Sequence, residues 1–382
     1  MIYLDNNSTT PLDRTVLDAM LPYLTTKFGN ASNTTHDYGS EAARAVDRAR
    51  MQVASLLGAD PKEIVFTSGA TESNNLAILG AVRGSRQSGD HVITTRIEHK
   101  AILNPCRQLE REGVKVTYLP VDTTGYLHAE AVAEAITDRT VLVSVMAANN
   151  EVGTLLPVAE IGRICKERDV LFHSDAVQAL GRVPVDAQEL GVDLLSVSAH
   201  KMYGPKGVGA LYVRGRSPAV RLEPLVYGGG QERGLRSGTI PVPNVVALGV
   251  ASELAGKHLA TEPARLRDLR ERLRERISSA VASAVVHGHP GLTLPGLLNI
   301  GFPEVDGDVL IHSLRGVALS QGSSCSAGSF EPSHVLRALG VGDALARASI
   351  RMGVGRFSTP EEIDSAAELI VKAIRSLGEV AN

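Results

Sequence analysis

The chain has 382 residues and a formal net charge of −3 at pH 7, with 43% hydrophobic and 21% charged residues. This composition is ordinary for a globular protein and excludes a disordered or low-complexity chain. The nearly balanced charge argues against direct binding of nucleic acid or of a membrane surface. The length suffices for about two or three domains, each with its own hydrophobic core.

The sequence predicts a protein of the reducing cytoplasm. No apolar run approaches the roughly 18 residues of a membrane-spanning helix, and the N-terminus turns polar at Asp5, so we expect neither a membrane span nor a signal peptide. Three widely separated cysteines fit neither a disulfide framework nor a zinc site. Cys106 and Cys165 have apolar neighbours within helical patterns, and we expect both in the core.

Short β-branched runs alternate with helical patterns in the first two thirds of the chain. The predicted strands are 63–67, 91–95, 114–119, 140–146, 170–173, 194–198 and 208–213. The predicted helices between them are 72–83, 98–112, 128–137 and 157–168. This alternation predicts right-handed crossovers and a mainly parallel sheet covered on both faces. Ligands of such sheets bind at the carboxyl ends of the strands.

A charged amphipathic helix at 262–282 is predicted to lead from this sheet into a smaller unit. The elements predicted for that unit are strands 297–301, 317–320 and 350–354 and helices 306–315, 332–339 and 360–377. We assign residues 15–258 to the large domain and residues 1–14 with 259–382 to the small domain. The helix at 12–24 has no sheet partner before it, and we expect it to pack with the small domain.

Lys201 directly follows the predicted strand 194–198, together with Ser198 and His200. Desolvation at the dry end of a strand favours a neutral, nucleophilic amine, which is what a Schiff-base lysine needs. The Ser198 hydroxyl and the His200 ring are suited to binding an anionic phosphate. The alternative for Lys201 is a side chain that extends along the surface into solvent.

Two other segments contain groups that suit a pyridine cofactor. Asp175 follows the strand 170–173, and Gln178 comes three residues later. A carboxylate facing a ring nitrogen keeps that nitrogen protonated, although a helix N-cap is an equally ordinary role for an Asp here. The segment 66–75 runs from a strand through Gly into a helix, where backbone N–H groups and the Thr71 hydroxyl suit an anion.

Three further polar residues lie near predicted strand ends or inside a strand. His99 suits stacking on a ring or acid–base chemistry, and a satisfied structural histidine is the alternative. Asn149 follows a strand and suits a carboxylate. Arg351 is a charge inside an apolar strand, so it requires an anion, either a substrate carboxylate or an internal salt bridge. The Gly-rich segment 227–239 is too long for a simple turn and is typical of functional or interfacial loops.

Cys325 differs from the other two cysteines because its neighbours, residues 320–329, are all small or polar apart from its own thiol. Nothing in this segment is bulky enough to bury a thiol. We therefore expect an exposed, mobile nucleophile.

The order of these motifs is more specific than any one of them. The motifs are residues 4–7, 9–11, 69–75, 98–100, 149–153, 198–201, 236–239 and 322–325. Along nearly its whole length the chain resembles the cysteine desulfurases of the NifS/IscS type, pyridoxal-phosphate enzymes of fold type I in the class-V aminotransferase-like family. The resemblance implies an α/β fold, with a mainly parallel seven-stranded sheet in the large domain and a smaller α/β C-terminal domain.

The resemblance also implies a role for each candidate residue. Lys201 resembles the Schiff-base lysine, Asp175 the partner of the pyridine nitrogen and Gln178 the partner of the phenolic oxygen. His99 is expected to stack on the ring and to assist proton transfer. The expected phosphate-binding residues are Thr71, Ser198 and His200, with Thr239 contributed by the other subunit of a homodimer. The expected substrate-carboxylate residues are Asn149 and Arg351, and the persulfide-forming residue is Cys325.

Within the family, Cys325 matches the subgroup that carries its cysteine in a long loop, since 25 residues separate it from Arg351. The implied reaction converts L-cysteine to L-alanine and leaves a persulfide on Cys325, with His99 as the expected base for the thiol. Ser324 and residues 326–328 depart from the commonest loop residues, which predicts a changed acceptor preference rather than lost catalysis.

The expected sulfur acceptor is a protein, either an iron–sulfur scaffold or a tRNA-thiolation protein, and a DNA-modification partner fits the sequence equally well. The enzymatic alternatives are a selenocysteine lyase and a class-V aminotransferase. A sulfur-carrying or scaffold protein without catalysis is the alternative from another functional class.

Overall fold

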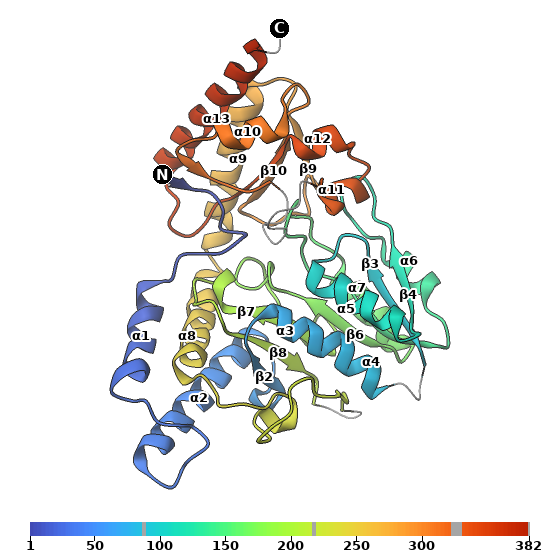
Figure 1. The fold of residues 1–382 in the computed structure, drawn as a ribbon, viewed down its shortest axis with the longest axis vertical. Coiled ribbons are helices and arrows are strands. Elements are labelled where there is room, and N and C mark those ends of the chain that lie inside the picture. Colours follow the sequence, from blue (N-terminus) through green and yellow to red (C-terminus); the bar gives the residue numbers. More distant parts are fainter. Residues whose placement is uncertain (86–88, 216–218, 322–330, 381–382) are drawn as a thin grey trace.

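The computed structural model describes residues 1–85, 89–215, 219–321 and 331–380. In the lower body of Figure 1 a seven-stranded sheet has the order β2–β8–β7–β6–β5–β3–β4. Only β8 runs antiparallel to its neighbours in this sheet. The strands are β2 (Ile64–Thr67), β3 (His91–Thr95), β4 (Lys115–Leu119), β5 (Thr140–Ser144), β6 (Leu171–Asp175), β7 (Leu194–Ser198) and β8 (Gly209–Val213). The predicted mainly parallel sheet is confirmed.

The apolar runs of these strands are buried on both faces of the sheet. Successive residues point to opposite faces, so Val92 joins one hydrophobic cluster while Ile93 joins the other. Leu194 and Leu195 divide between the two clusters in the same way. A strand covered on both faces needs apolar residues at every position, which explains the near-continuous apolar runs in the sequence.

Helices cover both faces of this sheet (Figure 1). They are α2 (Asp37–Leu56), α3 (Ala70–Asn75), α4 (Ala81–Gly84), α5 (Lys100–Arg111), α6 (Ala129–Ala135), α7 (Val158–Glu167) and α8 (Val242–His258). A π-helical turn at Leu76–Gly80 joins α3 to α4 into one continuous helix. Short 3₁₀ helices are η1 (Pro61–Glu63), η3 (Ala199–Lys201) and η4 (Glu232–Gly234). The sequence prediction missed α2 and α8.

A second hydrophobic core lies in the upper body of Figure 1, around an antiparallel three-stranded sheet of order β12–β10–β9. Its strands are β9 (Val285–His287), β10 (Leu297–Gly301) and β12 (Ser349–Gly353). Its helices are α9 (Glu262–Ala280), α10 (Gly307–Ser313) and α13 (Pro360–Val380). α11 (His334–Ala338) and α12 (Asp343–Arg347) instead bury Val335, Leu336 and Ala346 in the core of the large body. α9 and α13 pack against each other, each with one apolar stripe towards the core.

The first residues of the chain belong to this second core. β1 (Ile2–Tyr3) pairs in parallel with β11 (Val317–Ala318), and Leu4 is fully buried in the second hydrophobic cluster. The predicted domain boundaries at 14/15 and 258/259 stay a prediction, and the first hydrophobic cluster also includes Leu297 and Leu336 from beyond the second boundary. No helix in the described parts of the chain has the length and apolarity to cross a membrane. Cys106 and Cys165 are buried, as predicted.

The expectation that the helix at 12–24 packs with the small domain is wrong. This helix, α1 (Arg14–Thr25), packs against α8 in the large body, where Val16 and Met20 contact the small side chains of Ala247 and Ala251. Only the residues before the helix pair with the second body. An apolar stripe shows that a helix is packed, but not which partner it packs against.

α2 and α8 approach each other closely enough to make Gly249 essential. A Cβ at this position would lie 2.6 Å from the Ala49 Cα. We expect Gly249→Ala to lower the free energy of unfolding by about 1–3 kcal/mol, because overpacking outweighs the better helix propensity of alanine. The measurement is urea-induced unfolding followed by circular dichroism.

Gly256 of the same helix provides the matched control, because a Cβ there meets no atom nearer than the Leu56 Cδ1 at 3.6 Å. Gly256→Ala is expected to keep or slightly raise the stability, by up to about 1 kcal/mol. Equal stability of the two variants would contradict the close contact between α2 and α8.

Candidate active site

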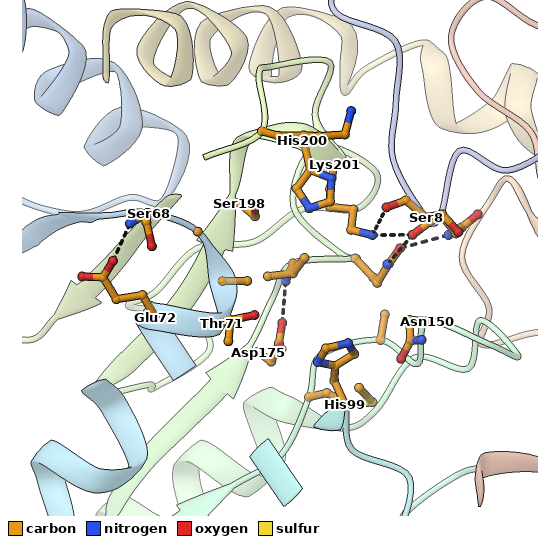
Figure 2. Close-up of a pocket in the computed structure, with 18 of the residues that line it drawn as sticks. Ser8, Ser68, Thr71, Glu72, His99, Asn150, Asp175, Ser198, His200 and Lys201 are labelled. Carbon is orange, nitrogen blue, oxygen red and sulfur yellow. Dashed lines mark hydrogen bonds between the residues drawn. The ribbon is translucent and has the colours of Figure 1, made fainter. Parts of the chain in front are cut away.

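A cavity of about 330 Å³ lies at the carboxyl ends of the parallel strands. Figure 2 shows Asp175, Lys201 and His99 around it, with Ser68, Thr71 and Glu72 on one side and Ser8 and Asn150 on the other. Asn7 and Ser8 complete the wall from the N-terminal segment, which pairs with the second body, and Arg351 does so from β12 of that body. The cavity is therefore formed by both bodies, at the edge of the sheet where ligands of such folds bind.

Lys201 points into this cavity from η3, directly after β7. Its Nζ donates hydrogen bonds to the carbonyl oxygens of Asn7 and Ser8, both at 2.6 Å. The side chain therefore does not extend into solvent, which was the alternative interpretation. The amine lies where a carbonyl compound in the cavity can be attacked.

Asp175 ends β6 and is held in one orientation. Its Oδ2 accepts a hydrogen bond from the Asn74 side chain at 2.7 Å, and its Oδ1 accepts one from the Val177 backbone N–H at 3.0 Å. The second contact closes a turn, and no helix begins in the fully described segment between β6 and β7, so Asp175 is not a helix N-cap; the same carboxylate lines the cavity. Gln178 also lines it and exchanges two hydrogen bonds of 3.0 Å with Asn7.

His99 lines the cavity and caps the first turn of α5. Its Nδ1 accepts a hydrogen bond from the Ala101 backbone N–H at 3.1 Å. In a neutral imidazole the other nitrogen, Nε2, then carries the proton. His99 is therefore arranged to donate a proton, and the role of base for the thiol stays a prediction.

Glu98, beside His99, is fully buried and was missed as a functional residue. Its Oε1 accepts hydrogen bonds from the Thr95 hydroxyl at 3.0 Å and from the Met146 backbone N–H at 2.9 Å. Burial raises the pKa of Glu98 to about 8, and the negative charge of Asp175 adds to this effect. Glu98 is therefore protonated at neutral pH, and Asp175 has no ionised Glu98 beside it.

Thr71, Ser198 and His200 lie together at one end of the cavity, and their role in binding a phosphate stays a prediction. The turn before them requires Gly69, whose φ is 149°, in a region that residues with side chains rarely adopt. Burial lowers the pKa of His200 to about 4, and the positive charges of Lys201 and Lys206 lower it further. His200 is therefore neutral at neutral pH, so it would meet an anion as a hydrogen-bond donor and not as a cation.

The Gly-rich segment 227–239 is held against this end of the cavity. The Arg236 Nε donates to the Glu72 Oε1 at 2.9 Å. Partial burial raises the pKa of Glu72, but hydrogen bonds from Arg236 and Ser68 outweigh burial, and its net pKa lies below the usual value. Thr239 is exposed and does not line the cavity of its own chain.

Arg351 enters the opposite end of the cavity from β12 and is 2% exposed. Its Nη1 donates to the Asn150 carbonyl oxygen at 3.0 Å. Its Nη2 donates to the Ser8 Oγ at 2.5 Å and to the Asp5 Oδ1 at 3.2 Å. The internal salt bridge is therefore present, and because the guanidinium also lines the cavity, its role for a substrate carboxylate stays a prediction.

Asn149 does not line the cavity, whereas Asn150 does. The Asn149 Oδ1 accepts hydrogen bonds from the backbone N–H groups of Glu151 at 2.8 Å and Val152 at 3.0 Å, and its Nδ2 donates to the Ile97 carbonyl oxygen. These hydrogen bonds occupy the Asn149 side chain and stabilise the turn formed by residues 149–152. The substrate role of Asn149 stays a prediction, and Asn150 is the neighbour that the sequence prediction missed.

Cys325 lies outside the described residues, but both flanking segments contact residues that lie next to the cavity lining. Before it, the Ser320 hydroxyl donates to the Asp5 Oδ1 at 2.8 Å. After it, the Ser333 hydroxyl donates to the Glu151 Oε2 at 2.5 Å, and the His334 Nε2 lies 3.0 Å from the Glu98 carbonyl oxygen.

The Aminotransferase class-V family matches residues 2–365. The chain belongs to this family. A "Cysteine desulfurase" of Homo sapiens is 52% identical over 380 residues, which cover 100% of this chain and 83% of that relative. A "Cysteine desulfurase IscS" of Rickettsia felis is 49% identical over 380 residues, covering 100% of this chain and 92% of that relative.

Among solved structures, one titled "NIFS-LIKE PROTEIN" superposes with a TM-score of 0.91 at 39% identity, covering 98% of this chain and 100% of that one. Enzymes of the class-V family use pyridoxal phosphate. The donor set of this cavity fits that group, since an amine, a carboxylate and a cluster of hydroxyl and backbone donors surround one space.

The substitution Glu98→Gln tests whether the buried carboxyl of Glu98 is protonated at neutral pH. An unfolded glutamate ionises near pH 4.5 and the folded Glu98 near pH 8, so this residue stabilises the fold below that window and loses its contribution as the pH rises through it. Between pH 6 and pH 8 the variant should gain roughly 2 kcal/mol relative to the wild type.

Urea unfolding at pH 6, 7 and 8 measures this difference, and Glu134→Gln, on the exposed face of α6, is the control. A Glu98 variant whose stability follows the wild type at every pH would mean that the buried carboxyl is ionised throughout.

Proposed function

We propose that the chain is a pyridoxal-phosphate-dependent cysteine desulfurase, which converts L-cysteine to L-alanine and retains the sulfur as a persulfide on Cys325. The observation that carries the proposal is one cavity with Lys201 and Asp175 at its centre and the buried Arg351 at one end. The names of the relatives support the same activity.

The residues that would hold pyridoxal phosphate come from the strand ends. Lys201 would bind its aldehyde carbon, Asp175 its ring nitrogen and Gln178 its phenolic oxygen, with His99 stacked on the ring. The phosphate would be held by Thr71, Ser198 and His200. When bound, the cofactor supplies a protonated ring that stabilises negative charge on the α-carbon of an amino acid.

Arg351 and Asn150 form the end of the cavity that suits an α-carboxylate. A guanidinium binds a carboxylate through two parallel N–H donors, which fixes its position as well as its charge. The Lys201 Nζ lies between this end and the cofactor residues, so it is the group placed to take the α-proton. His99, with its proton on Nε2, is placed to return a proton to carbon.

Sulfur transfer is proposed to occur by attack of the Cys325 thiolate on the substrate sulfur. A sulfur–sulfur bond forms, the substrate carbon–sulfur bond breaks, and its electron pair remains on the carbon that becomes the alanine methyl group. A free thiol is only a few per cent ionised at neutral pH, so a base would assist this step, and His99 is the expected residue.

A selenocysteine lyase or an aminotransferase would use the same Lys201, and a sulfur-carrying scaffold would use none of these groups. Cys325 separates these activities from desulfuration. Cys325→Ala should lower alanine and sulfide formation from L-cysteine by about 100-fold or more, while the yellow colour of the bound cofactor remains. The measurement is quantification of both products together with the visible spectrum.

Cys165→Ala is the matched control, since this thiol is buried in the core of the large body. Burial raises the pKa of Cys165 to about 12, so it is not a nucleophile at neutral pH. An unchanged alanine output in Cys325→Ala would refute desulfuration through this cysteine. Protein purified without bound pyridoxal phosphate would favour the scaffold instead.

We also propose a homodimer in which Thr239 serves the cavity of the other subunit. Thr239 is exposed in its own chain. Exposed apolar side chains include Leu21 and Leu24 of α1, Phe28 after it and Tyr38 at the start of α2, and Phe28 stacks on Tyr38. An exposed apolar cluster of this kind suits an interface between subunits.

Mixing two inactive variants tests this arrangement. In a mixed dimer of Lys201→Ala and Thr239→Ala, one cavity keeps both residues only if Thr239 comes from the other subunit. Random reassociation should then restore about one quarter of the wild-type activity. No recovery in dimers shown to be mixed would place Thr239 with its own chain or outside the site.

The sulfur acceptor is proposed to be a protein of iron–sulfur cluster assembly or of tRNA thiolation, in keeping with the family resemblance. The cytoplasmic location stays a prediction. A relative from Drosophila melanogaster is named "Cysteine desulfurase, mitochondrial".

A further inference from the structure

The guanidinium of Arg351 already has an anion beside it before any substrate arrives. Arg351 is 2% exposed, and its Nη2 lies 3.2 Å from the Asp5 Oδ1. A buried guanidinium without a counter-charge is strongly destabilising, so this carboxylate has a structural task. A β-bridge joins Asp5 to Gly353 of β12. This bridge holds the N-terminal segment beside β12 and thereby fixes Asp5 next to Arg351.

Asp5 also has two hydroxyl partners that hold its charge in place. The Ser8 and Ser320 hydroxyls both donate to the Asp5 Oδ1 at 2.8 Å. The Ser8 Oγ in turn accepts a hydrogen bond from the Arg351 Nη2 at 2.5 Å. One guanidinium nitrogen is therefore shared between a carboxylate and a hydroxyl, both supplied by the N-terminal segment.

We propose that Asp5 is a resident counter-anion that competes with the substrate carboxylate for Arg351 and thereby sets the affinity of the enzyme for amino acids. The inference rests on the proposed function, because it requires a carboxylate substrate at Arg351. Asp5 does not line the cavity, so it acts through Arg351 as a positioning residue. A second carboxylate at the same guanidinium shares its donors and is repelled by the first.

The physical consequence is a site of moderate affinity. With Asp5 present, the guanidinium is compensated in the empty enzyme, and an incoming carboxylate gains less than it would at an isolated arginine. The product L-alanine carries the same α-carboxylate as the substrate. A weaker hold on this group therefore also speeds the release of product.

Asp5→Asn in the holoenzyme tests this inference, because it removes the charge and keeps the shape. The dissociation constant of L-alanine, read from the change in visible absorption, should fall about tenfold. The dissociation constant of L-alaninamide, which has no carboxylate, should change by less than about twofold. Thermal unfolding without L-alanine should occur at a lower temperature than in the wild type, and L-alanine should stabilise the variant more strongly.

Asp364→Asn is the matched control, since Asp364 forms exposed ion pairs with Arg272 and Arg276 in the second body. It removes the same charge far from Arg351 and should leave both dissociation constants unchanged. Ser320→Ala covers the case in which Asp5→Asn does not fold. Loss of this hydroxyl leaves Asp5 a stronger partner for Arg351, so L-alanine should bind about two- to threefold more weakly.

Unchanged or weaker L-alanine binding in Asp5→Asn would overturn the inference, and so would an equal gain for L-alanine and L-alaninamide. Both ligands bind without desulfuration. A wild-type protein that makes no sulfide would therefore refute the proposed function alone, while the two dissociation constants still decide the role of Asp5.

Discussion

Two hydrogen bonds from the Lys201 amine to the carbonyl oxygens of Asn7 and Ser8 join the two bodies of the molecule at the cavity. Both acceptors are backbone atoms, so their position depends on the path of the N-terminal segment and not on its side chains. That path is held by β1 on one side and by contacts with Gln178 on the other. The reactive amine is thus oriented by the contact between the bodies.

Two titratable groups at or beside the cavity are uncharged at neutral pH. Glu98 is protonated at neutral pH and His200 is neutral, because burial moves the pKa of each towards its uncharged form. The remaining charges include the amine of Lys201, the carboxylate of Asp175 and the pair of Arg351 with Asp5. Because Glu98 and His200 are neutral, the electrostatic potential in the cavity depends on the charged groups, each of which has a separate role.

The sequence predicted the strands of the large sheet to within a few residues, because strands buried on both faces carry continuous apolar runs. It missed α2, whose buried stripe consists largely of Ala42, Ala45 and Ala49, and α8, which is apolar on several sides. Alanine gives a weak periodic signal, and a helix without a polar face gives none.

Site residues at strand ends were predictable because the carboxyl ends of parallel strands meet at one edge. The contributions of Asp5, Asn7 and Ser8 were not, since they depend on a long-range pairing with β11 and β12. The sequence also could not show which of Asn149 and Asn150 lines the cavity. Adjacent residues of a turn point in different directions, and only the tertiary structure decides which one faces the cavity.

The pairing of β1 with β11 also sets an order of events during synthesis. Ile2 pairs with Val317, so the first strand leaves the ribosome long before its partner exists. At translation rates of about 5–20 residues per second, the N-terminal segment waits roughly 15–60 s. The large sheet has time to form in this interval, whereas the carbonyl groups that hold Lys201 reach their place only afterwards. The catalytic centre can therefore be completed only after β11 has been synthesised.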